Sequence, residues 1–448
     1  MPINYLIPPI FSMLIFILPV PGTIALRNVL FVLLTLLLLI GFIRDKSYLR
    51  VSNLNTSLVI MTAIFFVFIL YVFFHSIYIS EVIEWSLNNL RRHLFYGFLY
   101  FIVGLLIANF AYKSKSFSIR SLLTILFFSM FVHIFYIDMV ALDKLWNANE
   151  ILRRYGGLIE YITAANYITN ILLAFCIAEL VYRLRTREKI LLVSDGVLYL
   201  LIGFSIVSSF IEGLRLGDIA LVLLGVGSAV VFLYRNQDFS RRKRQLIAAS
   251  LIVILSLPLA YNIAMDPRWA KLIETVPMAI NSADSQHWVD HSQPMPKTES
   301  GYAVGGSNYE RIFRAKKSID FIYSEPLGIG YGGDSFGRAF KKIYSDYGKE
   351  VYHGRDSHSA ILSLTIGVGI PGLFLWIFFI FYASKTSIIN LKKNYDFFPI
   401  LSIFILMGMF SRSFVDTNMR DHIIMQYMII FGIVIFLTLK RNSIEKSN

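Results

Sequence analysis

Cysteine and charge are both scarce in this chain. Its 448 residues include one cysteine, Cys176, so no intramolecular disulfide can form, and its place inside an apolar run argues against a thiol site. Charged residues make up only 16% of the chain, whereas soluble domains contain about 25%. No internal repeat and no low-complexity segment is visible. These deficits exclude a disulfide-stabilised scaffold and an ordinary soluble domain.

Long apolar runs are what the chain has instead. Hydrophobic residues make up 56% of it, and the mean hydropathy is +0.62. A transmembrane helix needs roughly 20 mostly apolar residues. We therefore expect an all-α polytopic membrane protein with about 12 transmembrane helices, the first of them retained because it lacks the features of a signal peptide. The expected spans are 4–20, 28–43, 57–79, 94–111, 119–140, 163–182, 190–210, 216–234, 245–263, 358–384, 397–415 and 422–439.

The positions of the excess basic residues indicate the membrane topology of the chain. A formal net charge of +13 would suit a nucleic-acid partner if it formed one patch. Instead, 21 basic and only five acidic residues lie in alternate connections and the C-terminal tail, at 44–50, 113–120, 183–189, 235–244, 385–396 and 440–446. Cytoplasmic loops of membrane proteins carry this excess of Lys and Arg. We therefore expect both termini to be cytoplasmic and no nucleic acid to bind.

Four extracytoplasmic connections stand out from the short remainder. Residues 80–93 have the character of an interfacial amphipathic helix. Residues 141–162 form a medium loop, and the turn from Glu212 to Asp218 is very short. The fourth connection, residues 264–357, is a large loop between expected spans nine and ten. It holds 12 basic and 12 acidic residues and is therefore neutral overall. Any anion site within it must come from a local cluster of basic residues.

The large loop divides into two parts. Residues 264–306 are rich in Pro, Ser, Gly and His, which predicts irregular structure. Residues 307–323 predict a helix, because apolar residues recur there at helical spacing and Pro326 ends the segment. The chain is therefore expected to divide into spans one to nine, a partly helical loop domain, and spans ten to twelve with the tail, at 1–263, 264–357 and 358–448.

Arginines close to the membrane are the first candidates for a binding site. Placing a charge at membrane depth costs free energy, so such residues usually have a functional role. Arg215 lies in the tight turn between two spans. It either binds an anionic headgroup or forms a local ion pair in a solvated turn. Arg311 and Arg314 lie three residues apart, so they share a helix face, which is either part of a site or simply solvated. Arg153 and Arg154 have the same two interpretations.

A glycine-rich segment, PLGIGYGG, follows the expected loop helix at residues 326–333. It matches the pattern GxGxxG. A dinucleotide-binding fold needs that pattern after a strand in a βαβ unit, and here it follows a helix in an extracytoplasmic loop. We interpret it as a flexible turn over a membrane cavity.

The segment HGRDSHS, residues 353–359, runs directly into an expected span. Asp356 or Ser357 can cap that helix, which would place His358 in its first turn. The positive end of the helix disfavours an imidazolium, and a neutral histidine is a competent general base. The alternatives are a structural histidine and a metal site formed with His353 and Asp356. The ligand set is too small for a convincing metal site, so no metal is expected.

In order and spacing, these features resemble the bacterial O-antigen ligases, within the wider ligase/polymerase superfamily. The resemblance covers most of the chain, including about twelve spans and a large late loop. Arg311 lies fifteen residues before Pro326 in RIFRAKKSIDFIYSEPLGIG, and DSHSAILSLTIGVGIPGLFLW places His358 at the junction of loop and helix. In GLRLGDIALVLLG, Arg215 falls where these enzymes carry an arginine.

The resemblance implies a reaction that uses no metal and no nucleotide cofactor. Such ligases move a glycan from undecaprenyl diphosphate to a sugar hydroxyl of lipid A–core, on the periplasmic side of the bacterial inner membrane. The expected partners are therefore the lipid-linked glycan, lipid A–core and membrane lipids. Aromatic residues of the large loop could offer surfaces to the sugars, at Trp269, Trp288, Tyr302 and Tyr309.

The resemblance also implies roles for individual residues. His358 would deprotonate or orient the acceptor hydroxyl, and Arg215 and Arg311 would hold the diphosphate and stabilise it as a leaving group. Weaker candidates are Arg153, Arg154, Arg314 and Asp356. Some relatives carry a second histidine two residues before the junction histidine. This chain has Asp356 there, which puts a two-histidine mechanism in doubt.

Other functions remain open at this stage. An O-antigen polymerase would use the same donor but extend another lipid-linked glycan, and spacing barely separates it from a ligase. An oligosaccharyltransferase of the same superfamily is usually longer. A polysaccharide transporter or flippase would not need catalysis, but it usually shows internal repeats, broken helices at the midplane and short loops.

Overall fold

The structure of the protein, a computed structural model, describes residues 5–44, 55–114, 117–235, 239–265, 267–281, 294, 296–297, 301, 304, 306–343, 356–419 and 421–444. Every regular element in these ranges is a helix. The expected all-α class is therefore confirmed.

Ten helical segments in the described part of the chain are long and apolar enough to cross a membrane. Two more, α1 and α15, are apolar but shorter. Together they occupy the twelve expected segments. Their bounds are α1 Ile7–Ile17, α2 Ile24–Arg44, α3 Thr56–Tyr78, α5 Tyr96–Lys113, α6 Ile119–Ala148, α7 Ile162–Thr186, α8 Asp195–Glu212, α9 Arg215–Arg235, α10 Arg241–Met265, α14 Ala360–Lys393, α15 Phe397–Ser413 and α16 Asp421–Ile444.

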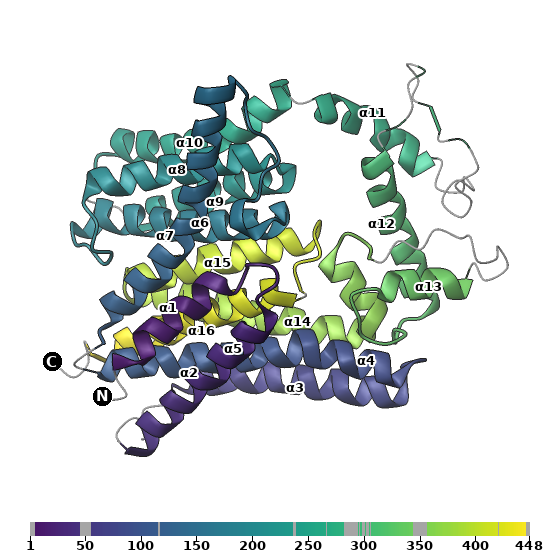
Figure 1. Ribbon diagram of the computed structural model, residues 1–448, viewed down its shortest axis with the longest axis horizontal. Coiled ribbons are helices and arrows are strands. Elements are labelled where there is room, and N and C mark those ends of the chain that lie inside the picture. The colour runs from purple at the N-terminus through teal and green to yellow at the C-terminus, as the bar shows by residue number, and fades with distance from the viewer. Residues whose placement is uncertain are drawn as a thin grey trace.

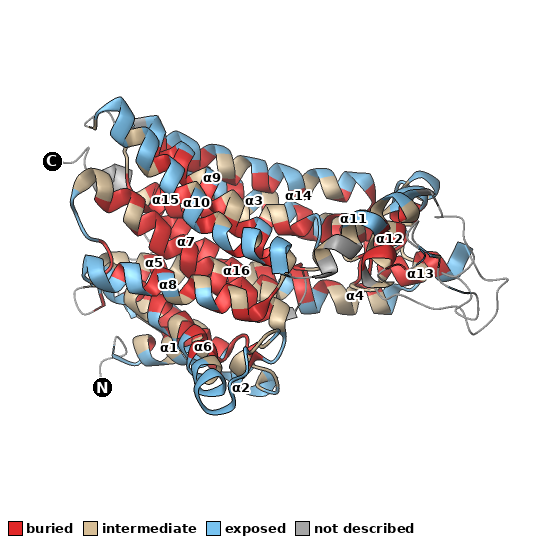
Figure 2. Cartoon of the chain, turned by 90° about the horizontal axis from the view of Figure 1, so that it is seen from above, coloured by how far each residue is buried: buried red, intermediate tan, exposed pale blue. Residues whose placement is uncertain are grey.

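The helices form layers around a buried centre. In Figure 1, α8, α9 and α10 lie on one side of α14 and α15, and α3, α4 and α5 lie on the other. Burial is greatest in α7 and α16, whose most apolar stretches are 89% and 83% buried, and Figure 2 shows red residues concentrated along both. The outer helices keep an exposed apolar face, as lipid contact requires.

Helices α5 and α16 approach each other especially closely. A side chain on Gly104 would meet the backbone of Ile429 and Gly432, and one on Gly432 would meet the carbonyl of Phe101. Without a hydrophobic drive between helices in lipid, such close packing of small residues supplies much of the attraction. These glycines therefore hold the central helix α16 in place.

Three expectations for the connections between spans need correction. Residues 80–93 are not a separate interfacial helix, because α4 (Ile83–Leu90) continues through a π-helical turn, η4 (Arg91–Phe95), into α5. Part of the segment expected to be irregular is helical, as α11 (Pro267–Asn281). The expected loop helix is confirmed as α12 (Gly306–Ser324), and a further helix, α13 (Ser335–Ile343), was not expected.

The glycine-rich segment after α12 is bonded into a break in α14. Gly369, inside α14, has φ 72° and ψ 178°, which interrupts the helical hydrogen bonds. The backbone N–H groups of Ile329 and Gly330 donate to the freed carbonyls of Ile366 and Gly367 over 3.0 and 2.9 Å.

Two further bonds complete this contact. The N–H of Ile370 donates to the carbonyl of Pro326 over 2.9 Å, and the hydroxyl of Tyr71 donates to the carbonyl of Val368 over 2.8 Å. Backbone polar groups at membrane depth must be satisfied inside the protein. The segment is thus an anchor that ties the large loop to α14, rather than only a flexible turn. An open apolar groove of about 800 Å³ runs beside it, along Pro326, Leu327 and Phe374.

Candidate functional site

Helix α12 brings the candidate residues together along one face. Asn308, Arg311 and Arg314 follow one another at intervals of three residues, which places them on the same side of the helix. A side-chain nitrogen of Arg215, at the start of α9, donates to Asn308 Oδ1 over 2.8 Å. The structure therefore joins Arg215 to the helix that carries Arg311, although the two arginines are almost one hundred residues apart in sequence.

Arg314 is not on a solvated helix face, contrary to that interpretation of the sequence. Only 6% of it is exposed. One guanidinium nitrogen donates to the carbonyl of Asp356 over 3.1 Å, and another lies 3.1 Å from a carboxylate oxygen of Glu310. Arg314 thus ties α12 to the segment that precedes α14, which makes it a positioning residue for His358.

His358 lies just outside α14 rather than in its first turn. The N-cap is Ser359, whose hydroxyl accepts from the N–H of Leu362, so neither Asp356 nor Ser357 caps the helix as expected. The backbone of His358 has φ 57°. Asp356 holds that conformation, because its carboxylate accepts the N–H of His358 over 2.9 Å.

The imidazole of His358 is partly exposed and lies beside a carboxylate. Its Nδ1 lies 3.4 Å from Asp356 Oδ1, and 35% of the side chain is exposed. Burial lowers the pKa of His358 below its ordinary value, and the positive charges of Arg314 and Arg311 act in the same direction, while Asp356 and Asp416 oppose them. A neutral imidazole can accept a proton from a substrate hydroxyl.

Arg311 stands close enough to His358 to influence its charge, and it has hydrogen-bonding capacity left. Its Nε is buried and has no hydrogen-bond partner within the described part of the chain. Buried donors in proteins are normally paired. An anionic ligand beside Arg311 would supply the missing acceptor.

The turn between α8 and α9 is buried, which contradicts the interpretation of a solvated turn. Glu212 and Asp218 are both 0% exposed. Arg153 donates to Asn262 Oδ1 over 2.8 Å, and Asn262 in turn donates to a carboxylate oxygen of Asp218 over 2.6 Å. Arg153 also lies 4.1 Å above the ring of Phe210, so its contacts hold the turn that carries Arg215.

Arg154 takes part in the same turn through its backbone. Its N–H donates to the carbonyl of Ile211 over 2.7 Å, and its φ is 59°. Within the described part of the chain, no side-chain hydrogen bond joins Arg153 or Arg154 to His358. Of the candidates, the structure therefore gathers His358, Asp356, Arg311 and Arg314 directly, connects Arg215 through Asn308, and leaves Arg153 and Arg154 on the supporting side of the turn.

Sequence reasoning missed Arg412, near the end of α15. It is 2% exposed, donates to Asn166 Oδ1 over 2.9 Å and pairs with Asp416 over 3.2 Å. The carbonyl of Asp416 accepts the N–H of Ala360, the first residue of α14, over 2.8 Å. The available signal was an arginine inside an expected span, a costly placement that marks a structural or functional need.

The same network reaches the turn before Arg215. Asn166 donates to one carboxylate oxygen of Glu212 over 2.6 Å, and Thr169 donates to the other over 2.6 Å. Glu212, Asn166 and Arg412, together with Asp416, therefore form a continuous chain of polar contacts from the end of α8 to the start of α14. This chain fixes the two halves of the site relative to each other.

The aromatic residues proposed as sugar surfaces differ in their placement. Trp269, on α11, has its ring 5.8 Å from the guanidinium of Arg215. Tyr309 is 0% exposed, so it packs in the loop core and offers no surface. Trp288, Tyr302 and His353 lie outside the described residues. Within the described ranges, no group of three His, Cys, Asp or Glu residues is arranged to hold a metal ion.

Comparison with known proteins adds one finding. Residues 200–377 match the family model described as O-antigen ligase, a range that contains Arg215, Arg311, Arg314 and His358. No curated protein matches the chain. The match supports the O-antigen ligase family, as the sequence resemblance had indicated, and with it an enzyme of the ligase/polymerase superfamily.

Proposed function

We propose that this chain, with its O-antigen ligase region at residues 200–377, is a glycosyltransferase of the inner membrane. It moves O-antigen glycan from undecaprenyl diphosphate to a sugar hydroxyl of lipid A–core, on the periplasmic side. Both termini lie in the cytoplasm, in keeping with the basic residues of the alternate connections. Residues 264–357 form the periplasmic loop domain that contributes Arg311.

The observation that carries this proposal is the grouping of fixed cations around one accessible imidazole. Arg311 lies within electrostatic range of His358, and Arg215 is held to the same helix face through Asn308. A diphosphate needs such cations, and arginine suits it because its planar fork binds two oxygens at once. A transferred sugar that lies between the diphosphate and the imidazole would have both a stabilised leaving group and a base for the acceptor hydroxyl.

The proposed step is a single displacement at the anomeric carbon of the donor. The acceptor oxygen forms the new glycosidic bond while its proton passes to His358. The bond from the anomeric carbon to the diphosphate oxygen breaks, and undecaprenyl diphosphate leaves with the electron pair. Arg215 and Arg311 stabilise the charge that develops on that leaving group, which is commonly the largest single contribution to catalysis.

The test is a lipopolysaccharide gel from a strain that lacks this gene. We expect bare core bands, with polymer retained on undecaprenyl diphosphate, and restoration of capped core by the unaltered gene. Core carrying a single repeat unit would instead identify a polymerase. Restoration by His358→Ala at a matched membrane level, or a requirement for an ion gradient, would indicate a transporter.

A further inference from the structure

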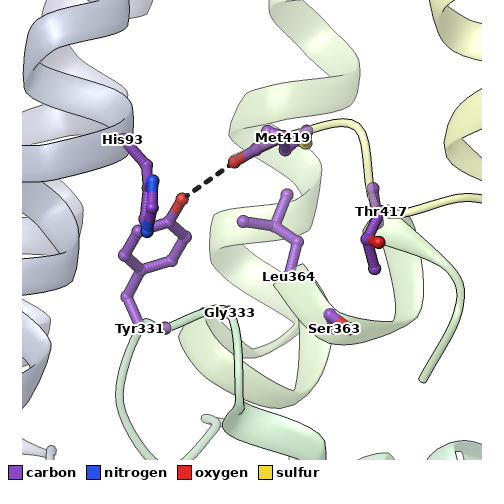
Figure 3. Close-up of a pocket in the computed structure, with 9 residues that line it drawn as sticks. His93, Tyr331, Gly333, Ser363, Leu364, Thr417 and Met419 are labelled. Atoms are coloured by element: carbon purple, nitrogen blue, oxygen red, sulfur yellow. Dashed lines mark hydrogen bonds between the residues drawn. The ribbon is translucent and has the colours of Figure 1, made fainter. Parts of the chain in front are cut away.

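A small cavity lies beside the first turn of α14, close to His358 but separate from the arginines. Figure 3 shows it between His93, Tyr331, Gly333, Leu364, Thr417 and Met419. Its volume is about 30 Å³, which is room for roughly two water molecules. It can therefore receive one edge of a sugar ring, but not a whole sugar.

The cavity adjoins the reacting group through the chain itself. Ala360, two residues after His358, forms part of its wall, and Thr417 follows Asp416, whose carbonyl binds the N–H of Ala360. His93 comes from the π-helical turn η4. Such turns insert one extra residue into a helix and often occur at functional sites. Here the turn places the imidazole of His93, which is 93% buried, beside the cavity.

The helices that carry Arg215 and His93 lie on different sides of α14. In Figure 1, α9, which begins at Arg215, lies on one side of α14 and α15, and α4, which leads into η4, lies on the other. A base and a leaving group in a single displacement act on opposite faces of the sugar. If the diphosphate binds beside Arg215, an acceptor held in the cavity would approach His358 from the side of η4.

The lining shows what kind of acceptor fits. Among the described residues that form the wall, none is Asp, Glu, Lys or Arg. Leu364 and Met419 are apolar, whereas Tyr331, Thr417 and His93 carry polar groups at the edge of the space. A phosphate or carboxylate would lose its hydration there without gaining a partner of opposite charge. A neutral sugar presents both apolar C–H groups and hydroxyls, so it matches.

From this placement we infer that the cavity is the acceptor subsite and holds one edge of a neutral sugar while its hydroxyl reaches His358. This inference rests on the proposed glycan transfer and adds the location and the class of the acceptor. It also predicts that His93 and the open space beside Gly333 determine which acceptor sugar binds.

Gly333 forms part of the cavity wall and has room for a side chain. A Cβ atom added there meets nothing within 4 Å. We expect Gly333→Ala and Gly333→Val to narrow the cavity in two steps. Gly203 is a matched control, because a Cβ there also meets nothing within 4 Å and the residue is exposed on α8, far from the cavity in sequence.

The experiment measures transfer by the full chain in proteoliposomes, with undecaprenyl-diphosphate-linked glycan as donor and lipid A–core as acceptor. We expect Gly333→Val to raise the KM for the acceptor about 10-fold or more, which is typical of a lost fit in a small pocket, and Gly333→Ala to raise it less. The KM for the donor should not change. Gly203→Val should behave like the unaltered chain.

Two outcomes would overturn the inference while leaving the proposed function intact. One is an unchanged KM for the acceptor in both Gly333 variants, and the other is an equal rise in the KM for the donor. No transfer by the unaltered chain would instead contradict the proposed function, and the subsite with it. As a test of ligand class, methyl glucoside should compete with the acceptor about 10-fold better than glucuronate; equal competition would exclude a neutral subsite.

Discussion

Arg215, Arg311 and His358 have different parts in the proposed transfer, so each can be tested alone. We expect alanine at any of the three to lower glycan transfer by at least about 100-fold, because each removes a group that acts on developing charge or on the proton. Transfer is measured in membranes that contain equal amounts of each variant. Lys316→Ala is the matched control, since Lys316 is exposed on the same helix α12.

Charge alone does not explain the choice of arginine at position 311. Its buried Nε and the rest of the planar guanidinium can bind two oxygens of a diphosphate, whereas lysine offers a single point charge. We expect Arg311→Lys to lose most of the activity, with a fall of about 10-fold or more. Full activity of Arg311→Lys would show that position 311 contributes only positive charge.

The pKa of His358 should be visible in the pH dependence of transfer. Burial and the neighbouring arginines hold this pKa below its ordinary value, so the base stays neutral to lower pH than a free histidine, whose pKa is about 6.5. When kcat/KM is plotted against pH, the acidic limb should therefore have an apparent pKa below that value.

The variant Asp356→Asn tests the direction in which Asp356 shifts the pKa of His358. The negative charge of Asp356 raises the pKa of His358, so its removal should move the acidic limb to still lower pH. The amide oxygen of asparagine can keep the bond to the N–H of His358. A shift of the limb to higher pH, or no acidic limb at all, would contradict the role of His358 as the base.

At the scale of elements, the break in α14 is the feature most sensitive to substitution. Gly369 has φ 72°, and a side chain there would meet the backbone of Leu327. We expect Gly369→Ala to lower the free energy of unfolding by at least about 1–3 kcal/mol, because it adds backbone strain and separates the loop from the helix. Thermal unfolding in detergent, compared with Gly203→Ala, measures this. An unchanged melting temperature would mean that the loop and α14 are not tied at this point.

The sequence predicted the spans well because an uninterrupted apolar run of about 20 residues is long enough to cross the membrane as a helix, which satisfies its own backbone hydrogen bonds. It predicted α12 from helical spacing, but not α11 or α13, which are short and pack through contacts distant in sequence. It placed His358 inside the first turn of α14 rather than just before the helix, because three residues that can cap a helix, Asp356, Ser357 and Ser359, lie within four positions. The link from Arg215 to Asn308 and the burial of Arg412 depend on tertiary packing, which periodicity does not reveal.

At the scale of the whole molecule, topology decides whether the proposed site faces the periplasm. Charge bias predicts that α14 runs from the periplasm at His358 to the cytoplasm at its C-terminal end. The chain is well suited to a test by cysteine labelling. Its single native cysteine, Cys176, is 0% exposed, so it should not react with a membrane-impermeant maleimide.

Two exposed lysines supply the labelling positions, Lys316 on α12 and Lys393 at the end of α14. We expect Lys316→Cys to be labelled in intact cells whose outer membrane has been permeabilised, and Lys393→Cys to be labelled only after the inner membrane is broken. The opposite pattern would place His358, Arg311 and the cavity in the cytoplasm. A lipid-linked glycan presented on the periplasmic face could not then reach them, so the transfer reaction proposed for this site would fail on topology alone.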